Sequence, residues 1–216
     1  AGQADKGAQI TAENRALCHR VANTLNYWDI KTVIVSCGTC MDQLLKYEFE
    51  RIFPGCRLLD INESQQEKGI SLENATGTKY LYHAPCHDPM KQKDGTSVAK
   101  DLLQTEEVQL NDRCCSEAGT LATARPDIST QLRFRKALEL KQGIQELTGE
   151  DKARDGNVKL LTSCPACQQG LNRYEGETGL QTDYIVVELA KNLNGENWKQ
   201  MFTDTLKNGG VEKILL

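Results

Sequence analysis

Short apolar runs alternate along the chain with longer amphipathic stretches. Val33–Val35 and Val158–Leu161 are apolar and partly β-branched, which predicts two buried strands. Residues 10–25 and 128–140 have the apolar spacing of amphipathic helices. The stripe expected on the second helix consists of Ile128, Leu132, Leu138 and Ile144. The alternation predicts an α/β protein with small, mostly parallel sheets flanked by helices.

Two stretches of the sequence repeat each other, residues 30–48 and 158–175. Aligning Cys37 with Cys164 also aligns Cys40 with Cys167. In both copies an apolar run leads into Ser-Cys-x-x-Cys and then a helical pattern, so the thiols fall where the first helical N–H groups favour thiolate. The match continues into expected strands at 58–61 and 184–187. A glutamate lies shortly after each of them, Glu63 after the first and Glu188 after the second. The sequence therefore predicts two pseudo-equivalent units.

The repeat also predicts where the units divide. Residues 67–78 are polar and contain glycine, which is typical of a connecting loop. We expect residues 1–77 to form the carboxyl-terminal part of a first unit and residues 78–216 to form a complete second unit with a carboxyl-terminal extension. In this alignment the adjacent pair Cys114-Cys115 maps just ahead of Ala1, so the first copy is expected to lack its own pair because the chain begins after it.

Composition narrows the class of protein. The 216 residues are 39% hydrophobic and 26% charged, as in ordinary soluble proteins, and the net charge of −4 gives no reason to expect nucleic acid or an anionic membrane as a partner. No apolar run is long enough to cross a membrane, and residues 1–11 lack the apolar region of a signal peptide. We expect a cytoplasmic protein, with attachment to a membrane only through partners.

Nine cysteines suggest metal chemistry. Disulfide frameworks are usual in small secreted domains, which this chain does not resemble. A lone cysteine, an adjacent pair and a C-x-x-C occur in order: Cys86, Cys114, Cys115, Cys164 and Cys167. Adjacent thiols suit a polynuclear iron–sulfur centre. Four zinc ligands with one bystander thiol are the alternative, although zinc sites commonly use two C-x-x-C pairs and each copy has one.

With these five cysteines in order, the sequence resembles the CCG cysteine-rich domain family. That family includes one of the subunits of heterodisulfide reductase and the iron–sulfur subunits of glycolate and lactate oxidation systems. The stretches HAPCHDPMK, NDRCCSEAGT and LTSCPACQQGL are especially similar to the carboxyl-terminal part of FAD-linked oxidases fused to such domains. Ser116 stands where the family has glycine, and Ala84 stands where aspartate is expected.

The resemblance implies ligands and a function. It implies that the five cysteines hold one [4Fe–4S]-type cluster, noncubane in heterodisulfide reductase, and that Cys37 and Cys40 are the last two ligands of a second cluster. Two thiolates alone cannot close a cluster site, so the alternative for Cys37 and Cys40 is that they are free or bind adventitious metal. It implies an electron-transfer module of a flavin-linked, hydroxy-acid-oxidising enzyme, with a flavoprotein domain or subunit and a redox acceptor as partners. FAD must then lie on a separate segment or subunit, because no Gly-rich dinucleotide fingerprint is present.

Two other functions stay open. One is a catalytic thiol–disulfide reductase of the heterodisulfide type. The other is a structural module that binds zinc or no metal.

Residues around the cysteines have expected supporting roles. His83 and His87 flank Cys86 and are expected to hydrogen-bond cluster sulfur or backbone, with direct ligation of the cluster or a metal as the alternative. Asp88 is expected to orient one of them. Arg133, Arg135 and Lys136 predict a solvated helix face, or a docking surface for an acidic redox partner.

Overall fold

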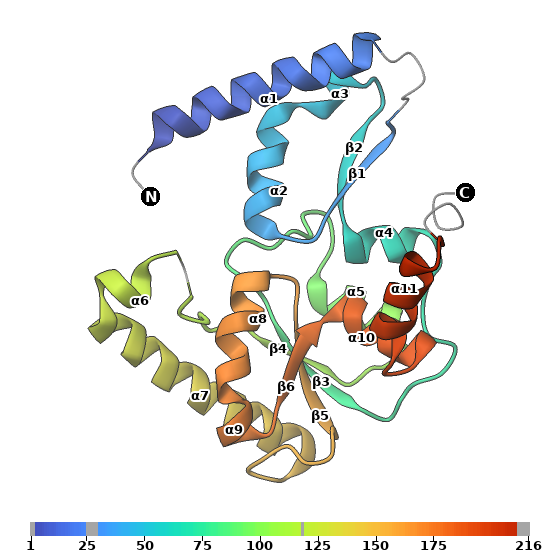
Figure 1. Cartoon of the computed structure of the whole chain (residues 1–216). Helices are drawn as coiled ribbons and strands as arrows, with labels where there is room; N and C mark the ends of the chain where they lie inside the picture. Colours follow the sequence, from blue (N-terminus) through green and yellow to red (C-terminus); the bar gives the residue numbers. More distant parts are fainter. Residues whose placement is uncertain (1–2, 25–29, 118, 211–216) are drawn as a thin grey trace.

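Two separate, all-parallel sheets organise the protein. The structure is a computed structural model that describes residues 3–24, 30–117 and 119–210 (Figure 1). The first sheet pairs β1 (Thr32–Val35) with β2 (Arg57–Asp60). The second has the order β4-β3-β5-β6, formed by β3 (Lys79–His83), β4 (Val108–Asn111), β5 (Val158–Thr162) and β6 (Gln181–Tyr184). The expected α/β class is confirmed.

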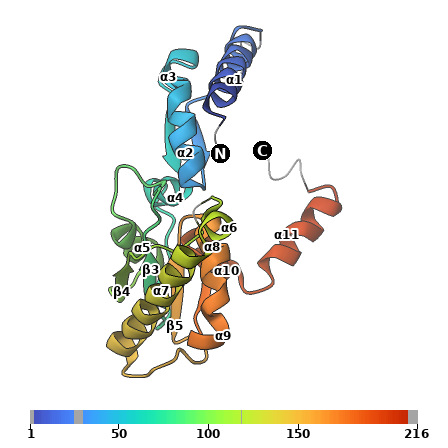
Figure 2. The same cartoon turned by 90° about the vertical axis from the view of Figure 1, so that its left-hand side faces the viewer.

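Helices surround both sheets, and two views show α1 lying far from the four-stranded sheet (Figures 1 and 2). Around the first sheet lie α1 (Ala4–Thr24), α2 (Gly38–Leu44), η1 (Leu45–Tyr47), α3 (Phe49–Ile52) and α4 (Ile61–Glu67). The helices after β3 are α5 (Gly95–Leu103), α6 (Leu121–Ala124), α7 (Pro126–Thr148), α8 (Pro165–Leu171), η2 (Asn172–Tyr174), α9 (Glu175–Thr178), α10 (Ile185–Asn194) and α11 (Trp198–Lys207). Among the described residues no helix is both long and apolar enough to span a bilayer.

The sequence repeat is also a structural repeat. In each copy a strand leads into a seven-residue helix, a short 3-10 helix, a four-residue helix, a second strand and a further helix. Cys37 and Cys164 occupy the same place, the extended residue just before the seven-residue helix, with φ/ψ of −151°/123° and −134°/126°. The C-x-x-C pairs therefore lie at strand-to-helix turns, as the apolar pattern predicted.

Alternation along β3 divides the main core into two layers. Tyr80 and Tyr82 point to the face covered by α5 and α10, whereas Leu81 points to the face covered by α7 and α8. All three side chains are almost fully buried. Because both faces are covered, nearly all side chains of β3 and β5 are buried, as expected for central parallel strands.

Two predicted boundaries are wrong by a few residues. The strand expected at 184–187 ends at Tyr184, and Ile185 begins α10. The strand expected at 58–61 likewise ends at Asp60. Short apolar runs do not distinguish a strand from the first turn of a helix. Here Ile185 and Leu189 lie four residues apart and bury one helix face.

The stripe expected on α7 is also wrong in part. Ile128 and Leu138 are 38% and 48% exposed. The side that packs inward carries Ser129, Lys136, Leu140, Gly143 and Ile144. A lysine and a glycine occupy two of those positions, so apolar residues alone placed the stripe wrongly. The other predicted helix, residues 10–25, corresponds to α1, and its last residue, 25, lies outside the described residues.

The turn between β1 and α2 packs against the loop that follows β3. A Cβ built on Gly38 would lie 1.5 Å from the carbonyl oxygen of His87, so only glycine fits there. Asp42 on α2 pairs with Lys91 Nζ at 2.8 Å and with the His87 ring. These contacts place the first C-x-x-C turn beside the loop that carries Cys86.

Candidate metal centre

One pocket brings together all five cysteines of the second copy. The pocket has a volume of about 270 Å³. Its cysteines are Cys86, Cys114, Cys115, Cys164 and Cys167. Cys86 follows β3, the adjacent pair follows β4, and Cys164 follows β5. The carboxyl ends of neighbouring parallel strands share one edge of a sheet, which is why thiols far apart in the sequence meet here.

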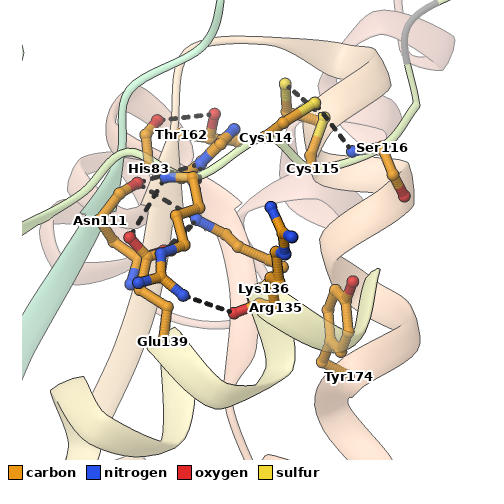
Figure 3. A network of polar contacts seen from close by, with 12 residues as sticks. His83, Asn111, Cys114, Cys115, Ser116, Arg135, Lys136, Glu139, Thr162 and Tyr174 are labelled. Carbon is orange, nitrogen blue, oxygen red and sulfur yellow. Dashed lines mark hydrogen bonds and ion pairs between the residues drawn. The ribbon is translucent and has the colours of Figure 1, made fainter. Parts of the chain in front are cut away.

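The thiols differ in depth. Cys115 and Cys167 are buried, with their sulfurs 3.2 Å apart. Cys114 and Cys164 are half-buried, and Cys86 is exposed at the mouth of the pocket. The backbone N–H of Ser116 donates to Cys114 Sγ at 3.3 Å (Figure 3). Of the five thiols, Cys115 and Cys167 are therefore the most deeply buried.

Contacts among the thiols shift their pKa values in opposite directions. The pKa of Cys115 is lowered by a hydrogen bond from the Cys167 thiol and by nearby His83, against the effect of burial. The pKa of Cys164 is lowered by Cys167 and by backbone N–H groups at the start of α8. Hydrogen bonds with Cys115 and Cys164 raise the pKa of Cys167, and burial raises the pKa of Cys86. Thiolate, the form that ligates metal, is thus favoured at Cys115 and Cys164.

Ser116 is held in a left-handed conformation, with φ of 63°. It is fully buried, and Arg133 Nε donates to its hydroxyl at 3.3 Å. A non-glycine residue in this region is strained because its Cβ approaches the following carbonyl. Its position directly after the cysteine pair requires the backbone that glycine adopts most easily, which explains why a glycine was expected there.

A buried polar network lies behind the deep thiols (Figure 3). Lys136, fully buried on α7, contacts His83 Nδ1 at 3.0 Å, Glu139 at 2.8 Å, and both the backbone and side-chain oxygens of Asn111. His83 Nε2 is buried and has no hydrogen-bond partner among the described residues. A ring nitrogen of His83 and the sulfurs of Cys115 and Cys167 lie within 4.8 Å of one another.

Sequence reasoning missed Lys136. It was expected on a solvated face with Arg133 and Arg135, and for Lys136 that expectation is wrong. Lys136 lies four residues before Leu140 and eight before Ile144, so it is on the same buried face of α7. This spacing is the only signal in the sequence that could have suggested its burial. Nothing in the local sequence distinguishes it from the two arginines.

Asp88 does not orient a histidine, contrary to expectation. Its carboxylate accepts from the Tyr82 hydroxyl at 3.3 Å and from the backbone N–H of Met90 at 2.9 Å. Asp42, from the first unit, contacts His87 instead. The two histidines flanking Cys86 are therefore held by residues distant in sequence.

Cys37 and Cys40 do not line this pocket, although Thr39 between them does. A hydrogen bond with Cys37 and burial raise the pKa of Cys40. The structure records no disulfide at any described cysteine. The role of Cys37 and Cys40 as ligands of a second cluster stays a prediction.

Comparison with known families agrees with this geometry. Residues 80–172 match the family model of the CCG cysteine-rich domain. The chain contains a CCG cysteine-rich domain. Residues 172–216, after the CCG domain, match a model described as a domain of unknown function. No solved structure matches the chain.

The curated relatives are iron–sulfur proteins or subunits of redox enzymes. An uncharacterized iron–sulfur protein of Methanocaldococcus jannaschii is 24% identical over 203 residues, which is 89% of this chain and 36% of the relative. The glycolate oxidase iron–sulfur subunit of Escherichia coli is 33% identical over 94 residues, 41% of this chain and 23% of the relative. A fumarate reductase (CoM/CoB) subunit of Methanothermobacter marburgensis is 25% identical over 174 residues, 77% of this chain and 31% of the relative. The chain spans about a third or less of each relative's length.

The residues of the CCG domain fit an iron–sulfur cluster. Five thiols face one pocket, and two of them favour thiolate. The His83 ring lies beside the deepest two, and its Nε2 is buried without a partner among the described residues, so a sulfur atom could accept a hydrogen bond from it. The donor set and this unpartnered nitrogen match the soft, hydrogen-bonded surroundings of such clusters.

Proposed function

We propose that the CCG domain holds an iron–sulfur cluster and serves as an electron-transfer module of an oxidoreductase. The observation that carries the proposal is the single pocket lined by Cys86, Cys114, Cys115, Cys164 and Cys167. When bound, such a cluster supplies one-electron transfer. The five thiols would ligate it, and the backbone N–H of Ser116 would donate to the Cys114 sulfur.

Iron–sulfur chemistry accounts for this pocket better than zinc does. A structural zinc site closes with four ligands in a tetrahedron, which leaves one of the five thiols without a role. Adjacent Cys114 and Cys115 both line the pocket, and a polynuclear centre can use both sulfurs. The names of the relatives point the same way.

We further propose a flavin-linked enzyme that oxidises a hydroxy acid. Support comes from the Escherichia coli relative, whose name is that of a glycolate oxidase subunit. FAD would lie on a separate segment or subunit, and a second redox partner would accept the electrons. Exposed Cys86 marks the side of the pocket on which a partner can approach closely. The division into residues 1–77 and 78–216 stays part of this proposal.

A second candidate function, thiol–disulfide reduction, is favoured by the exposure of the pocket to solvent at Cys86. The pocket reaches solvent at exposed Cys86, so a small sulfur compound could reach the deeper thiols. The relative named fumarate reductase (CoM/CoB) agrees with thiol chemistry near such a domain. A change in the cluster's EPR signal on adding a small disulfide or thiol would favour this candidate, and an unchanged signal would count against it.

The ligand assignment is tested by anaerobic quantification of iron and sulfide, together with EPR, on the purified chain and on Cys115→Ser. We expect iron and sulfide in the unaltered chain and a large loss of both in the variant. Cys18→Ser is the matched control, because Cys18 is half-buried outside the pocket and should retain full iron.

Two results would refute the proposal. A colourless chain that contains zinc and no iron would establish a structural zinc module. Unchanged iron in Cys115→Ser would show that this thiol is not a ligand.

A further inference from the structure

Lys136 is a buried cation that the proposed electron-transfer function does not yet use. Its side chain is 0% exposed, and burial of a charge is costly unless it is paired. Glu139 pairs with it at 2.8 Å, and the oxygens of Asn111 accept from it. Burial lowers the pKa of Lys136, and the Glu139 carboxylate opposes that effect. The pairing keeps a positive charge in the core.

The ammonium group determines which ring nitrogen of His83 carries the proton. Lys136 Nζ lies 3.0 Å from His83 Nδ1. A charged ammonium has only donors, so a hydrogen bond between these two atoms requires that Nδ1 accept and bear no proton. Asn111 O, 3.1 Å from Nδ1, could otherwise accept from a protonated Nδ1. A hydrogen bond from Lys136 to Nδ1 selects the Nε2–H tautomer of the neutral ring.

Because Nδ1 lies against Lys136 and Asn111, Nε2–H is the ring donor left for the nearby sulfurs. It has no hydrogen-bond partner in the part of the chain that the structure describes. The ring lies within 4.8 Å of the sulfurs of Cys115 and Cys167, which are the deepest two thiols. Both are acceptors once they are thiolates. An N–H donor and a buried positive charge behind it would both stabilise negative charge at this end of the pocket.

We infer that Lys136 holds His83 as an Nε2–H donor to sulfur, and that the pair thereby raises the reduction potential of the centre bound at Cys115 and Cys167. The inference rests on the proposed cluster. Hydrogen bonds to sulfur and local charge are established determinants of such potentials, because the reduced state carries one more negative charge. Lys136 is then a positioning residue that acts through His83.

The same geometry argues against His83 as a metal ligand. A ligating nitrogen must offer its lone pair, and the Nε2–H tautomer has none on the side facing the thiols. A ligating Nε2 would instead require Nδ1–H donating to Asn111 O, with the Lys136 ammonium donating only to Asn111 and Glu139. The histidine is therefore expected to bond sulfur and to make no bond to iron.

The tautomer can be measured without the cluster. We expect the ¹⁵N shifts of the His83 ring, in the full reduced chain freed of metal and shown by circular dichroism to be folded, to report Nε2–H. His83→Gln assigns the signals, since the chain has three histidines. In Lys136→Met the ring should change to Nδ1–H and donate to Asn111 O. An Nδ1–H ring in the unaltered chain overturns the inference, whether or not the variant folds.

The potential is measured by EPR-monitored redox titration of the iron-loaded chain. At a fixed potential, Lys136→Met should lower the ratio of reduced to oxidised cluster by about tenfold, which is about 59 mV for one electron. Lys141→Met is the control, since Lys141 lies on the same helix but is exposed and pairs with Glu177. It should leave the ratio unchanged.

The outcomes separate the two claims. A chain without iron refutes the proposed function, and the ring tautomer still reports on Lys136. A chain with iron whose potential is the same in Lys136→Met refutes this inference alone. Pulsed EPR on chain labelled with ¹⁵N-histidine should show only the weak coupling of a hydrogen bond, and a strong iron–nitrogen coupling would also overturn it.

Discussion

Two buried residues in the described structure adopt states that their types normally avoid. Ser116 has positive φ although it is not glycine, and Asp60 is a fully buried carboxyl group. Ser116 directly follows the cysteine pair, and Asp60 precedes the first residue of α4. Each yields a prediction for a single substitution.

Ser116→Gly should stabilise the protein relative to Ser116→Ala. Both variants lose the hydroxyl that accepts from Arg133, but only glycine relieves the left-handed backbone. We expect the free energy of unfolding of the glycine variant to exceed that of the alanine variant by about 1 kcal/mol. Urea denaturation of the two variants under one set of conditions measures the difference. Equal stabilities would show that the turn carries no backbone strain.

Asp60→Asn should remove a pH dependence of stability. Burial raises the pKa of Asp60 to about 6 in the folded protein, against about 3.9 for an unfolded chain. The folded state then binds the proton more tightly, so this carboxyl stabilises the fold fully below about pH 4 and loses that contribution as the pH rises toward 6.

The measurement is the free energy of unfolding of both proteins between about pH 3.5 and 7.5. Relative to Asp60→Asn, the unaltered chain should lose about 1 to 3 kcal/mol across this window, since one pKa unit corresponds to about 1.4 kcal/mol. The asparagine still offers an oxygen to the Asn62 backbone N–H at the start of α4. Parallel curves for the two proteins would contradict the assignment.

At the scale of elements, equivalent helices in the two copies begin differently. Asp60 and Glu63 form a capping box at α4, whereas Tyr184 precedes α10 without a side-chain cap. Likewise Gly38 opens α2 where Pro165 opens α8. Proline suits a first helical position. Glycine is required in the first copy because that turn lies against the backbone of His87.

Gly38→Ala should therefore separate the first C-x-x-C turn from the loop that carries Cys86. The added Cβ would lie 1.5 Å from a backbone oxygen, which cannot move as a side chain can. We expect the free energy of unfolding to fall by about 1 to 3 kcal/mol, the usual cost of overpacking. Gly176→Ala on α9 is the control, because nothing lies within 4 Å of its Cβ position. If both alanine variants are equally stable, the close approach is wrong.

At the scale of the whole molecule, the two sheets are unequally protected. β3 and β5 lie inside a sheet covered on both faces, and nearly all their side chains are buried. β1 has one hydrogen-bonded neighbour among the described strands, and Ile34 on it is 46% exposed. Local stability follows buried apolar contacts, so the first sheet should open more readily.

Hydrogen exchange should show this difference directly. We expect backbone amides of β5 to exchange at least about tenfold more slowly than those of the equivalent β1, which is about 1.4 kcal/mol in opening free energy. Equal rates would mean that the contacts of Gly38 and Asp42 with the loop after β3 make the two sheets unfold together.

The sequence by itself determined much of this protein. Short apolar runs that alternate with amphipathic stretches predicted the α/β class. The duplicated Ser-Cys-x-x-Cys after such runs predicted the strand-to-helix turns. Both features follow from local hydrophobic periodicity. The order of the cysteines predicted the CCG family. It also named the five thiols that the structure places around one pocket.

Only the tertiary structure decided what surrounds those thiols. Lys136 and Asn111 come from different elements and meet at His83 because β3, β4 and α7 pack together. Asp42 on α2, beside the first sheet, contacts His87 in the loop that follows β3 of the second sheet. Such contacts join residues far apart in sequence, and whether a lysine is solvated or buried depends on which helix face packs inward. That choice is made by the packing of the whole core, which no local pattern records.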